Sequence, residues 1–328
     1  MSHRCRVVRN SRLVDGQPHT VLGKLTLRAA GRANHDGAWM ALAMQCNGRM
    51  SADVRFGDYD VVAPLASGGM GGVFLATHRT TGDRVALKVL DPVFANHTEV
   101  VERLYAERTV SARASHPALV DIRSAARSAD NIPFLVMEYL EGETLTAVSG
   151  RGEIEMEDIV GLCAQIASGL AALHRAGIVH CDVKPDNLFV QDNGFVKVID
   201  FGVSRLVDEM PREDASIAGT PAYMAPEQWR GKPELASDVY SLGCVMYELL
   251  TGDVPFDGSL PELMLAHMDQ RPARPSWLRS AIPVEVERLV MRALAKAPGL
   301  RPTMHEMSRA LHRLADVALP TDTLRMAG

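Results

Sequence analysis

The sequence has few cysteines and no long hydrophobic run. Its five cysteines form an odd set without a CxxC pair, which argues against a disulfide framework and favours the reduced thiols of a cytoplasmic protein. The longest stretch free of Asp, Glu, Lys and Arg covers residues 61–78, and it contains Pro64 and four glycines. Such a stretch does not make a membrane-spanning helix, so we expect no membrane span.

Negative charge is scarce at one end of the chain. Residues 1–49 contain eight Lys or Arg and two Asp, a net charge of +6, whereas the whole chain of 328 residues carries −5. The remaining residues therefore carry −11, and an acidic body argues against nucleic acid as the main partner. Because 47% of the residues are hydrophobic, the chain can bury a substantial core as one large domain or two small ones.

The first 55 residues show no sustained hydrophobic period and mix Gly, Asn, Arg and His. We expect residues 1–55 to be a weakly structured extension. Three interpretations of this extension stay open. It is a dispensable tail, an arginine-rich targeting peptide, or the product of an over-extended reading frame, since the sequence from Met50 looks like a natural protein start.

The pattern changes to short β-type runs from Tyr59 onward. These runs cover residues 59–66, 72–78 and 84–90, and glycines or Thr81-Gly82-Asp83 separate them, which predicts antiparallel hairpins. A helix over residues 98–114 and strands over 119–124 and 133–139 are expected to follow.

After about Glu143 the pattern becomes helical. Apolar residues recur mostly at spacings of three and four over residues 159–173 and again over 239–250, where Gly252 ends the second stripe. Strands followed by helices predict an α+β fold with two unequal lobes, a small antiparallel sheet with one helix and a larger, mainly helical part.

Residues 65–76, LASGGMGGVFLA, make a glycine-rich hairpin. Glycines let backbone N–H groups approach a polyphosphate closely, although a flexible turn has the same composition. Further along, Lys88 ends the apolar run Val-Ala-Leu-Lys, where a buried ammonium group would need an anionic partner. Glu107 in the predicted helix is the candidate partner; the alternative is a lysine that extends to the surface.

The octapeptide HCDVKPDN, residues 180–187, groups Asp182, Lys184 and Asn187 in one loop. Phosphoryl transfer needs such groups: a carboxylate to accept a hydroxyl proton, a cation near the moving phosphoryl group and an oxygen ligand for Mg²⁺. The composition alone fits a polar surface turn better. However, the apolar-rich run 195–199 leads into Asp200, whose carboxylate would complete a Mg²⁺ site if that strand places it beside Asn187.

These motifs together resemble the Hanks-type serine/threonine protein kinases of bacteria and eukaryotes, over residues 58–315. The series is ordered: the glycine-rich hairpin, the lysine strand, a helix glutamate, the octapeptide, DFG at 200–202, GTPAYMAPE at 219–227, SDVYSLG at 237–243 and LRPT at 300–303. The resemblance implies a two-lobed kinase domain over residues 56–316, divided at about residue 140, with a tail over 317–328. It also implies transfer of the γ-phosphate of ATP to Ser or Thr hydroxyls of proteins.

The resemblance also implies a role for each catalytic residue. Asp182 would be the catalytic base, Lys184 would contact the γ-phosphate, and Lys88 would hold the α- and β-phosphates while paired with Glu107.

The cofactors implied are ATP and Mg²⁺. The metal ligands would be Asn187 and Asp200, and the nucleotide site as a whole would comprise Leu65, Gly68, Gly71, Val73, Ala86, Lys88, Met137, Glu138, Leu140, Asn187 and Asp200. Met137 would be the gatekeeper, and residues 138–140 would form the hinge that contacts adenine through backbone groups.

Other matching positions imply structural roles. Glu227 would pair with Arg301, and Asp238 would hold the backbone of the catalytic loop. Lys184 together with Thr220 favours Ser or Thr over Tyr as the acceptor.

Two positions depart from the family pattern. Ala66 replaces the first of three loop glycines, and we expect only a modest effect because Gly68 and Gly71 remain. Cys181 replaces an arginine that commonly binds a phosphate on the activation segment; a reactive thiol has no step to perform in phosphoryl transfer, so a structural thiol is favoured. Activity should therefore depend little on phosphorylation of Ser216 or other hydroxyls of that segment.

Substrate choice leaves only a faint trace in the sequence. Glu143 and Asp186 fall at or near positions where some relatives hold basic residues of the substrate, and the acidic body would attract basic peptides; solvated carboxylates are the alternative. Two other functional classes are a pseudokinase and a small-molecule phosphotransferase. The first usually lacks one of the catalytic residues present here, and the second is not expected to carry the GTPAYMAPE motif.

Overall fold

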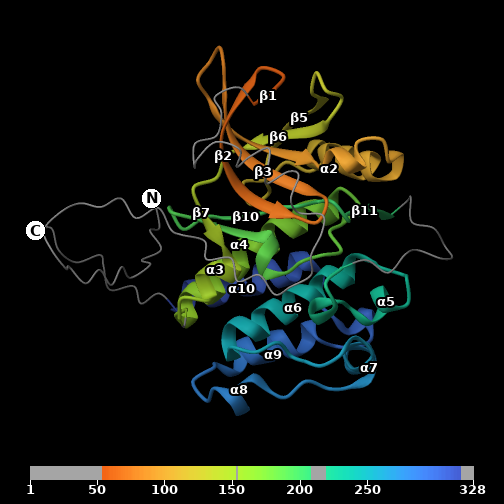
Figure 1. The fold of residues 1–328 in the computed structure, drawn as a ribbon. Coiled ribbons are helices and arrows are strands. Elements are labelled where there is room, and N and C mark those ends of the chain that lie inside the picture. The colour runs from red at the N-terminus through yellow and green to blue at the C-terminus, as the bar shows by residue number, and fades with distance from the viewer. Residues whose placement is uncertain (1–53, 153, 208–218, 319–328) are drawn as a thin grey trace, which may run out of the picture.

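The computed structural model describes residues 54–152, 154–207 and 219–318, so most of the predicted extension and tail lies outside the described residues. The small lobe is built on a six-stranded antiparallel sheet in the order β1-β2-β3-β4-β6-β5 (Figure 1). The strands are β1 (Arg55–Phe56), β2 (Tyr59–Gly68), β3 (Gly71–His78), β4 (Arg84–Leu90), β5 (Ile122–Arg127) and β6 (Pro133–Glu138). Helix α2 (Thr98–Arg113) packs beside this sheet, after the short 3₁₀ turn η1 (Pro92–Phe94).

Strands β2, β3 and β4, helix α2 and strand β6 confirm the predicted elements to within two or three residues. The predicted strand 119–124 was wrong in its bounds. Leu119 forms a parallel bridge with Val198 of the other lobe, and the N–H of Val120 donates to the carbonyl of Val198 at 3.0 Å. Because these backbone groups are already paired across the lobes, β5 begins only at Ile122.

The large lobe is mainly helical, as predicted, but it also contains short strands, of which the sequence predicted only the one at Val196–Val198, within the run 195–199. The helices are α3 (Leu145–Ser149), α4 (Met156–Arg175), α5 (Pro226–Trp229), α6 (Leu235–Thr251), α7 (Leu260–Asp269), α8 (Pro275–Leu278), α9 (Val284–Ala293) and α10 (Met304–Ala318), with 3₁₀ turns η2 (Pro185–Asn187), η4 (Pro221–Tyr223) and η5 (Pro298–Leu300). Strands β10 (Val196–Val198), β9 (Leu188–Gln191) and β7 (Gly142–Thr144) form one small sheet, and β8 (Ile178–Val179) pairs with β11 (Arg205–Leu206). The small strands bracket the octapeptide and therefore fix its position.

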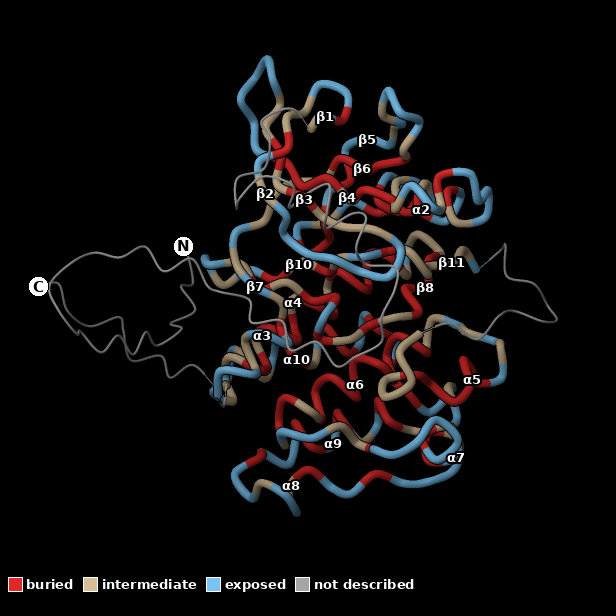
Figure 2. Tube along the Cα trace, viewed as in Figure 1, coloured by how far each residue is buried: buried red, intermediate tan, exposed pale blue. Residues whose placement is uncertain are grey.

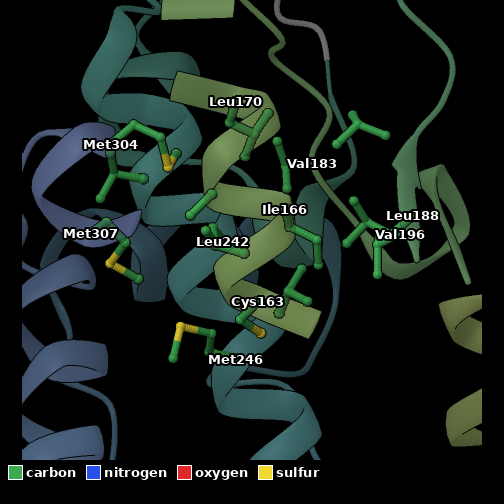
Figure 3. Packing of buried hydrophobic residues seen from close by; sticks show 14 of the residues in the cluster. Cys163, Ile166, Leu170, Val183, Leu188, Val196, Leu242, Met246, Met304 and Met307 are labelled. Atoms are coloured by element: carbon green, nitrogen blue, oxygen red, sulfur yellow. The ribbon is translucent and has the colours of Figure 1, made fainter. Parts of the chain in front are cut away.

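Helices α4 and α6 form the centre of the large lobe, and Figure 2 shows both as mostly buried. Cys163, Ile166 and Leu170 of α4 pack among side chains of α6, α10 and the octapeptide region (Figure 3). Gly252, with φ of 88°, ends α6 in the left-handed conformation, as the sequence predicted.

The sequence predicted no membrane span, but helix α4 has the length and composition of a membrane-spanning helix. However, 67% of its most apolar window is buried inside the fold. Its apolar surface therefore serves the core of the lobe.

Candidate active site

The catalytic loop lies between β8 and β9, and the side chain of Asp238 on α6 accepts hydrogen bonds from its backbone. One carboxylate oxygen of Asp238 accepts the N–H of His180 at 2.8 Å and the other accepts the N–H of Cys181 at 2.9 Å. His174 of α4 contacts the same carboxylate at 2.8 Å through Nε2. Asp238 is fully buried, so these contacts satisfy a charge that would otherwise be costly. The geometry matches the structural role predicted for this residue.

Asp182 lies at the centre of a polar cluster on this loop. Its Oδ1 accepts a hydrogen bond from Thr220 Oγ1 at 2.7 Å, and its Oδ2 lies 3.0 Å from both Lys184 Nζ and Asn187 Nδ2. Lys184 Nζ also donates to Thr220 Oγ1 at 2.8 Å. The loop therefore brings together the three side chains that the octapeptide predicted. The contact of Thr220 with Asp182 is an addition that the sequence did not indicate.

Lys88 on β4 confirms the predicted pairing with the helix glutamate. Lys88 Nζ lies 2.6 Å from Glu107 Oε1 and 2.9 Å from Asp200 Oδ1. It also sits opposite Val73 in the β3–β4 register, at the end of the glycine-rich hairpin. One ammonium group therefore joins the sheet, helix α2 and the segment that follows β10.

The three charges differ in their exposure, and their pKa values follow from that. Burial by itself lowers the pKa of Lys88, but its two carboxylate partners outweigh burial and raise it. Burial raises the pKa of Asp200, but Lys88 outweighs that effect and holds the pKa below its usual value. Glu107, with only 3% of its side chain exposed, has a pKa raised by burial to about 7, although Lys88 acts in the opposite direction. The more exposed Asp200 is thus the firmer anionic partner.

A cavity of about 380 Å³ opens between the glycine-rich hairpin and the catalytic loop. It is lined by Ala66–Val73, Lys88–Leu90, Val100, Arg103, Leu104, Glu107, Asp182, Asp200, Gly202 and Val203. The predicted residues Gly68, Gly71, Val73, Lys88, Asp182 and Asp200 therefore face a single space. Backbone groups of the glycine-rich hairpin, the ammonium group of Lys88 and the three carboxylates of Glu107, Asp182 and Asp200 face this space.

Gly71 is the loop glycine that the structure requires most clearly. Its φ is 153°, and a Cβ at this position would lie 2.1 Å from the carbonyl oxygen of Val89. Any side chain would force the hairpin away from β4. Ala66, which replaces the first glycine, pairs with Val73 in the β2–β3 ladder at a register irregularity, so its methyl group is accommodated.

The donor set fits the predicted divalent cation. The side-chain nitrogen of Asn187 donates to Asp182, which leaves the side-chain oxygen of Asn187 available as a metal ligand. Oδ1 of Asp200 accepts hydrogen bonds from Lys88 Nζ and from the N–H of Gly202, which leaves Oδ2 available as a metal ligand. The N–H of Ile199 donates to the backbone carbonyl of Asn187 at 2.9 Å, so strand β10 does bring the segment of Asp200 beside that of Asn187. Hard oxygen donors of this kind suit Mg²⁺.

The predicted adenine-side residues lie along β2, β4, β6 and the segment after it. Ala86 pairs with Met137 in the β4–β6 register, and Val73 lies on the neighbouring strand β3. Leu65, Ala86, Met137, Glu138 and Leu140 do not line the cavity described above, nor do Asn187 and Lys184. The cavity therefore corresponds to the phosphate side of the predicted nucleotide site.

Two buried side-chain contacts, made by Arg301 and by Gln228, lie next to the site and hold the segment that contains Thr220. Arg301 forms a bidentate pair with Glu227, at 2.6 and 2.9 Å, as predicted. Gln228 donates to the carbonyl of Cys181 at 2.8 Å, a contact that no sequence pattern indicated. Residues 219–229 are thereby fixed against the catalytic loop.

Cys181 is a buried structural thiol. It is 3% exposed, and burial together with nearby Asp238 raises its pKa well above the usual thiol range. Its φ of 68° is unusual for a residue other than glycine, and hydrogen bonds at its N–H and its carbonyl hold this conformation. A reactive thiolate is therefore disfavoured. Ser216 lies outside the described residues, so the expectation about its phosphorylation stays a prediction.

The two candidate substrate-binding carboxylates already have partners. Glu143 is paired with Arg151, and Asp186 Oδ1 accepts a hydrogen bond from Thr146 at 3.0 Å. Glu143 is therefore the weaker candidate, because a cation of the chain itself already neutralises it.

The chain matches the protein kinase domain family over residues 59–311. It is 41% identical over 253 residues to the serine/threonine-protein kinase Pkn1 of Myxococcus xanthus, which is 75% of this chain and 36% of that relative. It is 36% identical over 271 residues to the probable serine/threonine-protein kinase PknB of Corynebacterium glutamicum (78% and 42%), and 33% identical over 275 residues to PrkC of Bacillus subtilis (82% and 41%). The chain thus matches less than half the length of these curated relatives.

Proposed function

This chain belongs to the protein kinase family, and on that premise we propose that it transfers the γ-phosphate of ATP to Ser or Thr hydroxyls of protein substrates. The observation that carries the proposal is the arrangement around Asp182. Lys184, Asn187 and Thr220 contact its carboxylate, while Lys88 and Asp200 line the same cavity.

The contacts of Asp182 leave it free to act on a substrate. A carboxylate offers about four lone-pair positions, and Thr220, Lys184 and Asn187 take three of them. One position remains for the hydroxyl of the acceptor. That hydroxyl would be oriented by Asp182 and would give up its proton to it, while Lys184 lies close enough to stabilise negative charge on the phosphoryl group.

The triphosphate would lie against the glycine-rich hairpin and Lys88. Mg²⁺ held by Asn187 and Asp200 would neutralise phosphate charge. The chain's own contribution is therefore mainly positioning and electrostatic stabilisation.

The test is phosphate incorporation from radiolabelled ATP with Mg²⁺ into a generic basic protein, comparing the natural chain with Asp182→Asn. We expect incorporation with the natural chain and a loss of at least about a hundredfold with the variant. A natural chain that binds Mg·ATP without transferring phosphate would instead be a pseudokinase. Transfer to small-molecule acceptors but not to protein would indicate a small-molecule phosphotransferase.

We also propose a preference for basic protein substrates and a cytoplasmic location. The preference is supported by the net charge of the body and by Asp186, which lies on the catalytic loop close to Glu248. The location is supported by the buried free thiols of Cys163, Cys181 and Cys244. Peptide libraries that show no enrichment of Arg or Lys would remove the preference.

A further inference from the structure

Glu138 and Lys197 form an ion pair between the two lobes. Glu138 is the last residue of β6, and Lys197 is the middle residue of β10. Lys197 Nζ lies 2.6 Å from Glu138 Oε1, and the side chains are only 14% and 21% exposed, for Lys197 and Glu138 respectively. Since the pair is largely shielded from water, its attraction is much stronger than that of a surface pair.

Both members of the pair are further fixed by backbone groups. Glu138 Oε1 also accepts the N–H of Asp121 at 2.8 Å, and the N–H of Glu138 donates to the carbonyl of Asp121 at 2.9 Å. Lys197 Nζ also donates to the carbonyl of Leu119 at 3.2 Å. The two side chains therefore hold β6, the segment before β5 and β10 in one arrangement.

This arrangement joins two parts of the nucleotide site. Glu138 begins the segment 138–140, whose backbone is expected to contact adenine. Lys197 lies three residues before Asp200, and its strand β10 pairs with β9, the strand that follows directly from the loop that carries Asn187. No sequence pattern singled out Lys197, because its partner is far away in the sequence.

We propose that Lys197 is a positioning residue for the nucleotide, which acts through the carboxylate of Glu138 to fix the backbone of residues 138–140 relative to β10. The inference rests on the proposed function, since it assumes that adenine binds to this segment. Without Lys197, Glu138 would keep the N–H of Asp121 but lose its counter-charge in a poorly solvated place. The carboxylate would then move toward water and take the segment with it.

The experiment measures steady-state kinetics of Lys197→Met with ATP and with the protein substrate varied separately. We expect KM for ATP to rise on the order of tenfold, because part of the strength of a shielded ion pair is lost from nucleotide binding. We expect KM for the protein substrate and kcat to change less than about twofold, because Asp182 and its partners are untouched. Lys197→Arg, which keeps the charge, should restore most of the affinity for ATP.

The chain offers a matched control in the same lobe, away from residues 138–140. Arg55 pairs with Asp60 at 3.2 Å, but both side chains are about half exposed, at 52% and 44%. Arg55→Met should leave KM for ATP unchanged. The double variant Lys197→Met/Glu138→Gln should have a lower KM for ATP than Lys197→Met alone, because no unpaired charge remains.

The proposal is overturned if Lys197→Met has the KM for ATP of the natural chain, even with a lowered Tm, since that result indicates a purely structural lysine. It is also overturned if Arg55→Met raises KM for ATP equally, or if the KM for the protein substrate rises in parallel. Absence of phosphate transfer by the natural chain itself would count against the proposed function, and binding of ATP measured by calorimetry would then still test Lys197.

Discussion

Thr220 Oγ1 donates a hydrogen bond to Asp182 Oδ1 at 2.7 Å and receives one from Lys184 Nζ at 2.8 Å. Thr220 belongs to the segment after the undescribed residues 208–218, whereas Asp182 and Lys184 belong to the catalytic loop. A single hydroxyl therefore links the two segments that would have to meet the acceptor.

Thr220→Val should reduce kcat about tenfold, because a partly buried hydrogen bond between the two segments is lost and the carboxylate of Asp182 is less well oriented. Thr220→Ser retains the hydroxyl and should keep most of the activity. Initial rates with saturating ATP and protein substrate test this. Equal rates for the valine and serine variants would contradict the assigned role.

Ser216→Ala should keep most of the activity of the natural chain. Cys181 provides no cation for a phosphate, and Thr220 and Gln228 already hold the later part of the segment on the catalytic loop. Activity measured before and after phosphatase treatment tests the same idea without a mutation. A large loss in either experiment would show that phosphorylation is required despite the cysteine.

Arg301→Met should destabilise the fold by about 3–5 kcal/mol, because Glu227 would remain as an unpaired buried carboxylate. Arg301 also donates to the carbonyls of Ala236, Ala295 and Lys296, so neighbouring loops should loosen as well. Urea unfolding measures the change.

The matched control for that variant is Arg55→Met, which breaks a pair with Asp60 whose members are 52% and 44% exposed. It should cost less than about 1 kcal/mol. Similar losses for the two arginines would contradict the role of burial.

The contribution of His267 to stability should fall as the pH falls from about 6.5 to about 4, whereas Glu107, whose pKa is raised, acts in the opposite direction over a similar window. Burial, followed by nearby Lys296, lowers the pKa of His267 to about 4, and the ring packs against Tyr240 and Phe256. Since the folded pKa lies below that of the unfolded chain, the unfolded state binds the proton in this window and the folded state does not. The loss amounts to about 3 kcal/mol.

Urea unfolding at pH 7 and pH 4.5 tests this prediction. On going from pH 7 to pH 4.5, His267→Gln should lose less stability than the natural chain, whereas replacement of the exposed His305 by Gln should leave the change as it is in the natural chain. An unchanged pH dependence in His267→Gln would assign the acid sensitivity to another group.

The sequence predicted the site better than the details of the large lobe. Asp182, Lys184 and Asn187 are close in the chain, and Lys88 and Glu107 follow from strand and helix patterns, so their meeting could be anticipated. By contrast, β7, β8 and β11 are two or three residues long, too short for any period to show. Their pairing depends on tertiary contacts.

The contacts that sequence reasoning missed are mostly between residues far apart in the chain. Gln228 with Cys181 and Lys197 with Glu138 have ordinary polar side chains, whose partners only the folded arrangement selects. Similarly, β5 starts at Ile122 and not at residue 119 because Val198 competes for the backbone groups of Leu119 and Val120. Local propensity carries no information about such a competitor.

The double contact of Lys88 has a consequence for nucleotide entry. Its ammonium group is already paired with Glu107 and Asp200, so a phosphate that binds to Lys88 has to replace one of these carboxylates as its partner. The free energy needed to separate Asp200 from Lys88 would then contribute to the affinity for the triphosphate. A variant in which Asp200 pairs less firmly with Lys88 should therefore bind the triphosphate of ATP more tightly.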